Sequence, residues 1–502
     1  MRVVTGSEMR DLDQWTMQDF GMPGEMLMEN AGRAAAGRML TRLTLDERVI
    51  VLCGSGNNGG DGFVIARCLY EAGICPEVWL IPEENRLSGE AKFHYGLLLQ
   101  CGIQVNSVQA GGKRCEDVIA AADVVIDAML GTGVSGELRE PYASLVAACN
   151  ETAARVEAVD IPSGLPADEG VMWHTAVQAD FTVVLAAYKE SSFLPRTAPF
   201  YGEIEVVSIG LPPGTYDLLK YERRLWQRVD VQTTLPVRSA EDYKSTYGKG
   251  LIVGGSETMP GAPLLAGEAA LKSGTGLLTL ALPASFTSAA ASRLPEAMLQ
   301  PFSEGVRLSA DVTKFDAAAC GPGLGRDEAA AHLVQHLIYK TDGVLILDAD
   351  ALHILRPSEL KSRRKPTVLT PHAGELAALT GLSVEEVLQA PFQTSFNFAT
   401  AYGVYVVMKG AHTITSTPDG RQFVNPTGNA VLARGGTGDV LTGMVLAFTM
   451  SHTTLDAAVA NAVYLHGAAA DALAVTVPPH AVKTSDVISA LPLAFQSVES
   501  TD

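Results

Sequence analysis

Short apolar runs rich in β-branched residues alternate with glycine-containing turns and helical stretches along nearly the whole sequence. Arg48 to Cys53 is one such run, and it is followed by the glycine-rich segment 54–62 and an apolar helical stretch over 63–72. Strands that alternate with helices in this way are typical of α/β proteins with parallel sheets. The alternation stops around residues 212–238, which mix charge, proline and aromatic side chains. We therefore predict an α/β protein with two domains, 1–219 and 220–502.

The length and net charge of the chain limit the number of domains and the classes of partner that it can have. A chain of 502 residues is too long for one hydrophobic core, in agreement with two domains. The 37 basic and 56 acidic residues give a net charge of −19, which argues against nucleic acid or an anionic membrane as a partner. There is no signal-peptide pattern and no apolar run long enough to span a bilayer. The seven cysteines lack zinc-site spacing, so we expect free thiols and a cytoplasmic protein.

The segment Gly435-Gly436-Thr437-Gly438-Asp439 precedes an apolar helix predicted over 440–450. Glycines allow close backbone approach, and the start of a helix offers unpaired N–H groups to an anion. A carboxylate in a phosphate-binding loop is unusual, but it is useful as a base that takes a proton from a hydroxyl. The pattern therefore favours phosphoryl transfer to a hydroxyl, with Asp439 as base. The alternative is that Asp439 only caps the helix.

In the first half, small polar residues and carboxylates recur where predicted strands end. Asn58 follows the first strand, Asp127 ends another, and Asp160 and Ser163 follow a third. The carboxyl ends of parallel strands form the ligand-binding edge of such sheets. Asn58, Asp127 and Ser163 are predicted to converge there as hard oxygen ligands of an alkali or alkaline-earth cation, which leaves Asp160 for acid–base chemistry. Each residue taken alone is more often a cap or turn residue.

The second half repeats this arrangement without repeating the motifs. His372 follows the predicted strand 367–369, and Lys409 follows the strand 404–408. Both are expected at the same edge as Gly438 and Asp439. We interpret Lys409, Gly410, Ala411, His412 and Thr413 as nucleotide contacts and His372 as a substrate contact. Singly, a histidine or lysine at such a place is more often structural or solvated.

These motifs together resemble bifunctional NAD(P)HX repair enzymes, in which an NAD(P)HX epimerase is fused to an ADP-dependent dehydratase. In the first half the resemblance rests on segments 27–32, 56–62, 131–133 and 160–164. In the second half it rests on segments 259–262, 321–325, 348–352, 370–372, 409–411 and 435–439. The resemblance implies a Rossmann-like α/β/α sandwich followed by a ribokinase-like domain. NAD(P)HX is NADH or NADPH hydrated at C6 of the nicotinamide ring.

For the first half, the resemblance implies epimerisation of the C6 hydroxyl. Asp160 would be the acid–base residue, and K⁺ would be bound by Asn58, Asp127 and Ser163. The residues implied to hold the dinucleotide are Asn57, Asn58, Gly59, Gly60, Asp61, Gly131, Thr132, Gly133, Val134, Ser135, Gly136 and Glu137.

For the second half, the resemblance implies that Asp439 deprotonates the C6 hydroxyl for attack on the β-phosphate of ADP. The phosphate ester then eliminates to give NAD(P)H, AMP and phosphate. Gly438 and residues 409–413 would hold the ADP with Mg²⁺, and Ala262, Gly323, Gly325 and His372 would contact the substrate. A homo-oligomer is expected.

Three positions depart from the family pattern. Tyr243-Lys244-Ser245 stands in place of His-Lys-Gly, His353 in place of Asn, and Arg434 in place of a small residue. They leave the preference between ADP and ATP open. Alternative functions are a ribokinase-like small-molecule kinase fused to a non-catalytic nucleotide-binding domain, or a nicotinamide dehydrogenase that uses Gly54, Gly56 and Gly59 as its fingerprint.

Overall fold

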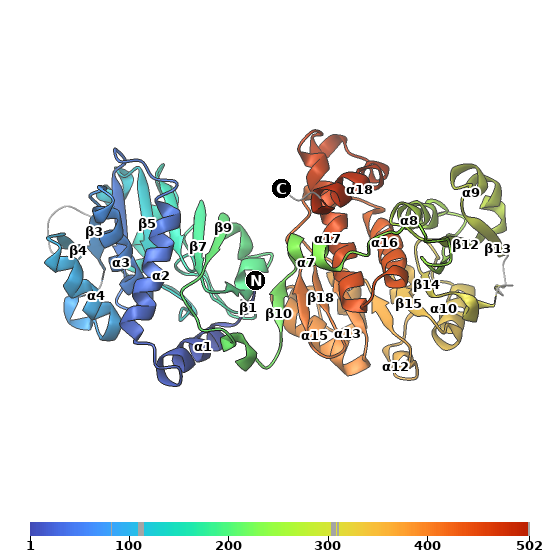
Figure 1. Cartoon of the computed structure of the whole chain (residues 1–502), viewed down its shortest axis with the longest axis horizontal. Helices are drawn as coiled ribbons and strands as arrows, with labels where there is room; N and C mark the ends of the chain where they lie inside the picture. Colours follow the sequence, from blue (N-terminus) through green and yellow to red (C-terminus); the bar gives the residue numbers. More distant parts are fainter. Residues whose placement is uncertain (82, 109–114, 303–307, 309–310, 500–502) are drawn as a thin grey trace. The chain divides into compact units, whose positions relative to one another are not determined.

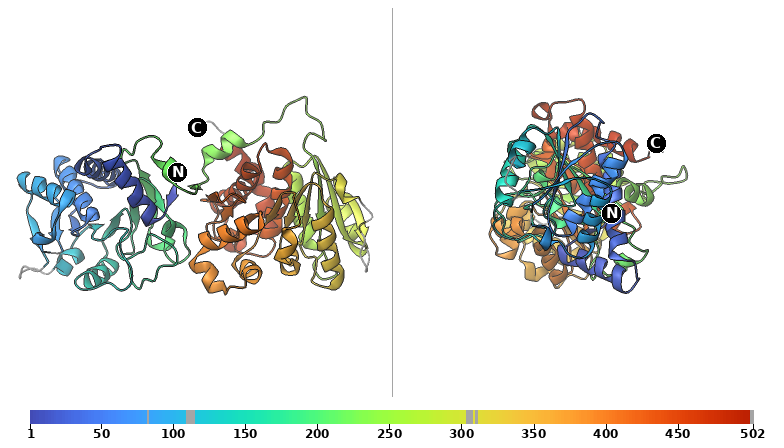
Figure 2. Two further views of the ribbon diagram at one scale, coloured as in Figure 1. Left: turned by 90° about the horizontal axis from the view of Figure 1, so that it is seen from below. Right: turned by 90° about the vertical axis from the view of Figure 1, so that its left-hand side faces the viewer.

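The computed structural model describes residues 1–81, 83–108, 115–302, 308 and 311–499. The chain divides into two compact units, residues 1–220 and residues from 221 onward, which Figure 1 colours blue to green and green to red. Each unit has a largely parallel sheet with helices on both faces, which Figure 2 shows from two further directions. The predicted α/β fold class is therefore confirmed.

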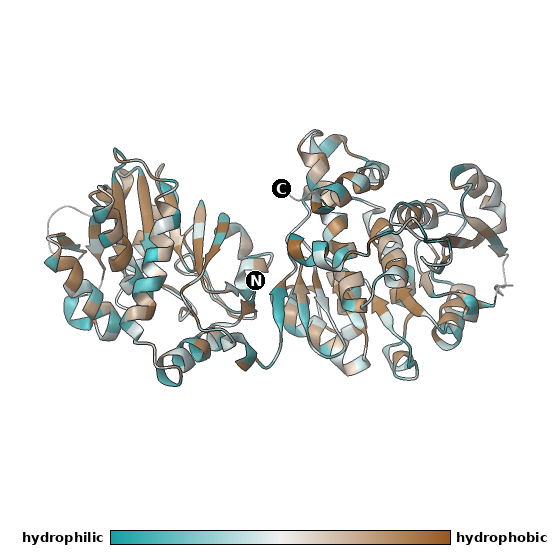
Figure 3. Cartoon of the chain, viewed as in Figure 1, coloured by the Kyte–Doolittle hydropathy of each residue, from teal (hydrophilic) through white to brown (hydrophobic). Residues whose placement is uncertain are grey.

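The sheet of the first unit has seven strands, all paired in parallel. In spatial order they are β4 (Val105–Ser107), β3 (Glu77–Leu80), β2 (Val49–Cys53), β5 (Val124–Ala128), β6 (Arg155–Val159), β7 (Phe181–Leu185) and β9 (Glu203–Val207). A short parallel pair, β1 (Val3–Val4) and β8 (Tyr188–Lys189), lies outside it. All five residues of β2 are buried, because helices cover both faces of the sheet. The central strands are accordingly brown in Figure 3.

The helices of the first unit form two hydrophobic cores with the sheet. One core contains side chains of α1 (Gly6–Gln18), α2 (Gly24–Met39), α3 (Asn57–Glu71) and α4 (Gly89–Gln100). The other contains side chains of α5 (Cys115–Ala120) and α6 (Tyr142–Glu151). Alternate residues of β2 point into the two cores, Val49 and Val51 into the first and Ile50 and Leu52 into the second.

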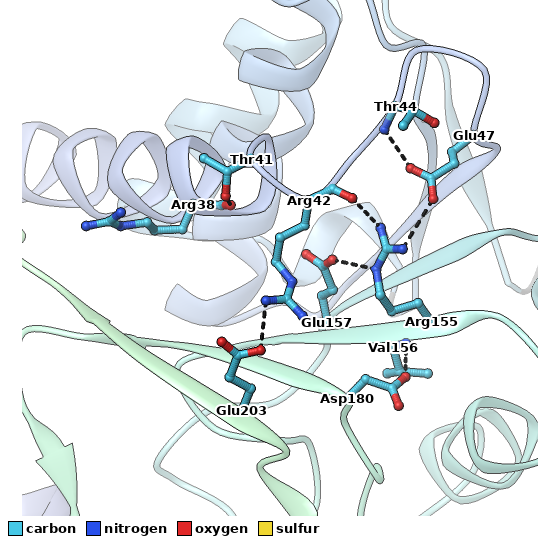
Figure 4. Close-up of polar contacts among 10 residues, drawn as sticks. All are labelled: Arg38, Thr41, Arg42, Thr44, Glu47, Arg155, Val156, Glu157, Asp180 and Glu203. Carbon is cyan, nitrogen blue, oxygen red and sulfur yellow. Dashed lines mark hydrogen bonds and ion pairs between the residues drawn. The ribbon is translucent and has the colours of Figure 1, made fainter. Parts of the chain in front are cut away.

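A network of charged side chains surrounds the amino-terminal end of β6 (Figure 4). Arg155 donates from Nε to the buried Glu157 at 3.0 Å, and it also contacts Glu47 and the carbonyl oxygen of Arg42. Arg42 pairs with Glu203 at 2.9 Å and lies over the ring of Phe181. Burial raises the pKa of Glu157, whereas Arg155 opposes the shift. These contacts join several elements at this end of the sheet, although Oε2 of Glu157 is buried without a hydrogen-bond partner among the described residues.

The sheet of the second unit has ten strands. In spatial order they are β10 (Arg223–Leu225), β19 (Gln422–Val424), β18 (Ile414–Ser416), β17 (Tyr405–Met408), β16 (Thr367–Leu369), β15 (Val344–Leu347), β14 (Ala317–Cys320), β11 (Lys249–Val253), β12 (Leu277–Pro283) and β13 (Met298–Phe302). Among the strands that the structure describes in this sheet, only β18 runs antiparallel to its neighbours. Because β10 pairs with β19, the sheet already includes residues from Arg223 onward.

Two hydrophobic cores also flank this second sheet. The larger includes α7 (Arg228–Thr234), α8 (Gly261–Lys272), α9 (Thr287–Arg293), α16 (Thr437–Ser451), α17 (Leu455–Ala474) and α18 (Thr484–Glu499). The smaller includes α10 (Glu328–Lys340), α11 (Asp350–Ile354), α12 (Pro357–Leu360), α13 (Ala373–Thr380), α14 (Val384–Gln389) and α15 (Pro391–Tyr402).

Two glycine-rich segments predicted to be loops belong to the first turns of helices. Residues 57–62 open α3, and residues 437–439 open α16. Packing explains the glycines in the first case. A Cβ on Gly59 would lie 2.0 Å from the carbonyl oxygen of Gly54, and one on Gly54 would lie 1.8 Å from that of Met129. The helix can therefore begin directly against the strand ends, where its free N–H groups face the ligand edge.

Candidate active sites

The first unit has a cavity of about 560 Å³ at the carboxyl ends of its strands. Several predicted ligand residues line it, namely Asn57, Asn58, Asp61, Gly131, Thr132, Gly133, Val134 and Asp160. Other residues predicted to hold the dinucleotide do not. Gly59 and Gly60 are buried in α3, and Gly136 pairs instead with the strand-like segment at Met172 and Trp173. Ser135 and Glu137 also lie outside the cavity lining.

Asn58, Asp127 and Ser163 converge as predicted from their strand ends. Asp127 is fully buried, and its carboxylate accepts hydrogen bonds from Ser163 N at 2.7 Å and Ser163 Oγ at 2.5 Å. Asn58 Nδ2 donates to the carbonyl oxygen of Leu130 at 2.9 Å, and Leu130 N donates to Ser163 Oγ at 2.8 Å. Burial raises the pKa of Asp127 to about 6, against the effect of its hydrogen bonds. The side chains of Asn58, Asp127 and Ser163 are therefore connected through the backbone of Leu130.

Asp160 lies directly after β6 with a φ of 64°, a left-handed conformation that costs a non-glycine residue energy and is often found at functional sites. Its Oδ1 accepts from Leu185 N at 2.9 Å and from Lys189 Nζ at 2.5 Å. Lys189, for which the sequence pattern predicts no role, is fully buried and also donates to the carbonyl oxygens of Leu185 and Ala187. The ammonium of Lys189 has three protons and three acceptors, so each proton is engaged in a hydrogen bond.

Sequence reasoning also missed Asp13. It lines the same cavity from α1, and its Oδ1 is buried without a hydrogen-bond partner among the described residues. Burial raises the pKa of Asp13 to about 7, Lys189 lowers it and Asp160 raises it. The pKa of Asp61 is also raised, first by burial and then by Asp160 and Asp13. A carboxylate beside the buried Leu12 of an amphipathic helix is the signal that would have identified Asp13.

In the second unit, Asp348 connects two strands and a helix at the carboxyl edge. It follows β15, and its Oδ1 accepts from Lys409 Nζ at 2.8 Å, just beyond β17. Its Oδ2 accepts from Thr442 Oγ1 of α16 at 2.7 Å, and Glu375 lies 3.8 Å from the same ammonium. Burial lowers the pKa of Lys409, but Asp348 and Glu375 outweigh burial and raise it overall.

Asp439 lies in the first turn of α16, beside this ion pair. Burial raises its pKa to about 7, with a further increase from the like charge of Asp348 and an opposing effect from Lys409. A carboxylate of this pKa exchanges protons readily at neutral pH, as a general base must. The neighbouring Gly438 offers room, since a Cβ there would lie 3.5 Å from Lys409 Nζ.

A cavity of about 510 Å³ opens beside Lys409 and the start of α16. Among the predicted nucleotide contacts, Lys409, Gly410, Ala411, Thr413 and Gly438 line it. His412 does not, and burial lowers its pKa. Sequence reasoning missed His466 of α17, which also lines the cavity; burial lowers its pKa to about 4, so its imidazole is neutral. His466 is buried among apolar residues of α17, a pattern that gives no sequence signal for a ligand.

The predicted substrate contacts of the second half lie at the same edge but outside this cavity lining. Ala262 and Gly323 are close together, because a Cβ on Gly323 would lie 3.1 Å from that of Ala262. Gly325 N donates to Asp350 at 3.0 Å. His372 forms a capping box with Glu375 at the start of α13 and pairs with Lys409 in an isolated bridge. Its side chain is 57% exposed, although its Nε2 lies 3.4 Å from Glu375 Oε1.

The described ranges contain no cluster of three or more His, Cys, Asp or Glu side chains that could hold a metal. Within the same ranges, no helix has the length and apolarity needed to cross a membrane. All seven cysteines are free thiols, as predicted, and five of them are buried.

Comparison with solved structures identifies the class of the second unit. A ribokinase-like superfamily protein from Enterococcus faecalis is similar, with 28% identity and a TM-score of 0.51 over 55% of this chain and 97% of that one. An ADP/ATP-dependent NAD(P)H-hydrate dehydratase from Bacillus subtilis, co-crystallised with ATP/Mg²⁺, gives 36% identity and a TM-score of 0.51 over 55% and 99%. The second unit therefore has the ribokinase-like fold.

Sequence comparison extends the relationship to both units. Residues 24–191 match the family described as YjeF-related protein N-terminus, and residues 250–493 match NAD(P)H-hydrate dehydratase. The bifunctional NAD(P)H-hydrate repair enzyme Nnr of Thermofilum pendens is 35% identical over 99% of this chain and 97% of its own length. That of Moorella thermoacetica is 33% identical over the same shares. The chain belongs to the family of bifunctional NAD(P)H-hydrate repair enzymes, which confirms the resemblance found in its motifs.

Proposed function

We propose that the chain repairs hydrated nicotinamide nucleotides, the first unit by interconverting R- and S-NAD(P)HX and the second by dehydrating S-NAD(P)HX with ADP. The observation that carries the proposal is Asp439, a carboxylate with a pKa of about 7 at the start of α16, beside a cavity that Lys409 and Gly438 line. Full-length similarity to bifunctional repair enzymes supports the assignment of one activity to each unit.

In the second unit, Asp439 takes the proton from the C6 hydroxyl of the substrate. The hydroxyl oxygen then attacks the β-phosphate of ADP, and AMP leaves. The resulting phosphate ester is a good leaving group, and its elimination regenerates the dihydronicotinamide ring. Lys409, Gly410, Ala411, Thr413 and Gly438 hold the nucleotide, while Ala262, Gly323, Gly325 and His372 contact the substrate. His412, which is half-buried and lies outside the cavity lining, stays a predicted nucleotide contact of the same segment.

The residues of the second unit suit Mg²⁺ carried by a nucleotide. Mg²⁺ is usually bound by substrate phosphates with one or two carboxylates, and a dedicated protein cage is not required. Asp348 and Glu375, beside Lys409, can supply those carboxylates. When bound, Mg²⁺ would neutralise the charge that develops on the phosphates. The Bacillus subtilis relative was crystallised with ATP/Mg²⁺, which supports the same nucleotide complex here.

In the first unit, Asp160 acts as an acid–base residue at the C6 hydroxyl, and Asn57, Asn58, Asp61 and the segment 131–134 hold the substrate. Asn58, Asp127 and Ser163, which are linked through the backbone of Leu130, would bind K⁺, because hard oxygen ligands suit such a cation. Asp127 places a carboxylate behind Ser163. When bound, K⁺ would order this end of the cavity. A cytoplasmic location, assembly into a homo-oligomer, and the absence of nucleic-acid and membrane partners stay predictions.

The test is recovery of dihydronicotinamide absorbance from a mixture of both NADHX epimers, with ADP, ATP or no nucleotide. We expect complete recovery with ADP, faster than spontaneous epimerisation allows. Recovery that stops at the S-epimer fraction would leave only the second unit active. If neither nucleotide gives recovery and a stable phosphorylated product accumulates with another substrate, the chain is a small-molecule kinase.

A further inference from the structure

Epimerisation at C6, the activity proposed above for the first unit, needs two proton transfers on opposite faces of the nicotinamide ring. The leaving hydroxyl must gain a proton, and the water that adds to the other face must lose one. A single carboxylate that lies on one face reaches only one of these positions. A second group in the cavity of the first unit must therefore exchange the proton on the other face of the ring.

Lys189 is unsuited to this task. Its Nζ donates to Asp160 Oδ1, to the carbonyl oxygen of Leu185 and to that of Ala187. An ammonium has three protons, so all of them are engaged with the protein. Lys189 therefore holds Asp160 in place and compensates its charge, whereas the proton transfers need other groups.

Asp13 differs from the other carboxylates of the cavity because one of its oxygens is buried without a partner. Its Oδ1 has no hydrogen bond within the described structure, although a buried carboxylate oxygen without one is costly. The groups that face it are Asp61 of α3, Asp160 after β6, Lys189 of β8 and Tyr216. Tyr216 donates its hydroxyl proton to the carbonyl oxygen of Ala186 at 3.1 Å. Asp13 lines the cavity, so its carboxyl group lies within reach of a molecule bound there.

We propose that Asp13 is a second catalytic residue of the epimerase, which exchanges a proton with the C6 hydroxyl on the face opposite to Asp160. The proposal rests on the proposed function and adds a residue to it. A pKa of about 7, raised by burial, is consistent with proton exchange at neutral pH.

The lone pair of the ring nitrogen forms an N1=C6 double bond as the C6–O bond breaks, and the protonated carboxyl group on that face gives its proton to the departing hydroxide. A water molecule then adds to C6 on the other face and loses a proton to the second carboxylate, while the electron pair returns to nitrogen. One carboxyl group starts protonated and the other ionised, and the reverse reaction restores them.

The test compares Asp13→Asn with Asp11→Asn, an exposed carboxylate on the same helix. Exchange of the separated R and S epimers is measured without ADP, and dehydration of the S epimer by the same preparations is measured with ADP. Asp13→Asn is expected to slow epimerisation about 100-fold or more in both directions and to leave dehydration unchanged. Asp11→Asn should leave both rates unchanged.

Further measurements separate chemistry from folding. Added formate should partly restore epimerisation in Asp13→Ala, which a purely structural role would not allow. If Asp13→Asn unfolds the first unit, the pH dependence of the wild-type epimerase rate tests the proposal instead. A rate that falls on both the acidic and the alkaline side supports a pair of carboxylates, and a rate that falls on one side only overturns the proposal. An Asp13→Asn variant that epimerises at the wild-type rate would also overturn the proposal. A wild-type protein with no epimerisation would instead contradict the proposed function.

Discussion

Lys409 and Asp348 lie 61 residues apart in the chain and form an ion pair of 2.8 Å between Nζ and Oδ1. The other oxygen of Asp348 accepts a hydrogen bond from Thr442, on the helix that Asp439 opens. One buried carboxylate thus connects the end of β15, the end of β17 and the start of α16. This arrangement places the ammonium of Lys409 next to the proposed base.

Lys409→Met should destabilise the second unit and shift the pH dependence of dehydration. Without the ammonium, the buried Asp348 and Glu375 lose their cation, which costs about 3 kcal/mol for a buried pair. The pKa of Asp439 should rise, because Lys409 lowers it. Chemical denaturation and the pH profile of kcat/KM measure the two effects. Lys314→Met removes an exposed pair and should change neither.

Asp439→Asn should abolish dehydration while nucleotide binding persists. The wild-type rate should rise as pH increases through about 7, because only the ionised carboxylate accepts a proton. The stability effect has the opposite sign. A raised pKa means that the folded state binds the proton more tightly, so stability falls between pH 3.8 and about 7. Asp439→Asn should therefore be more stable than wild type at pH 8. Substantial residual turnover would exclude Asp439 as the base.

Asp160→Asn should slow epimerisation selectively. Asparagine tolerates the left-handed backbone at this position, so the substitution removes charge without backbone strain. The buried Lys189 then loses its partner, and we expect a lower unfolding midpoint for the first unit as well. Epimer exchange and ADP-dependent dehydration are measured on the same sample. An equal loss of both activities would point to general misfolding.

Epimerisation should depend on K⁺. Replacement of K⁺ by choline at constant ionic strength should lower the epimerase rate, and added K⁺ should restore it. Ser163→Ala should weaken this response, because it removes a hydroxyl that faces Leu130 and Asp127. The control is an epimerase rate measured for Asn106→Ala, whose amide contacts the strand β3. Equal rates in choline and K⁺ would contradict the cation site.

Gly443→Ala should destabilise the second unit strongly. A Cβ at this position would lie 1.9 Å from the carbonyl oxygen of Ala266, where α16 crosses α8. Because backbone atoms cannot yield as a flexible side chain can, we expect a loss of about 3 kcal/mol or more. Gly261→Ala, at the open start of α8, should be nearly neutral. Equal stabilities of the two variants in denaturant would refute this close packing.

The sequence by itself determined the fold class, the strands that carry functional groups, and the family. Strands with β-branched residues and helices with apolar periodicity are local signals, and polar residues at strand ends mark the ligand edge of a parallel sheet. Asn58, Asp127 and Ser163 converge for that reason, as do Lys409 and Asp439. The sequence also indicated Asp160 and Asp439 as acid–base residues by type and position.

Only the tertiary structure decided which groups share a cavity and how their charges interact. Asp13 and Lys189 lie 176 residues apart and meet at Asp160, and His466 reaches the nucleotide cavity from the core helix α17. Ser135 to Glu137 match the motif but lie outside the cavity lining. Local patterns report on backbone preference and burial, whereas hydrogen-bond partners and pKa values depend on distances that only packing sets. For that reason the sequence indicates which strand ends carry the candidate sites, and the fold determines which side chains contact one another there.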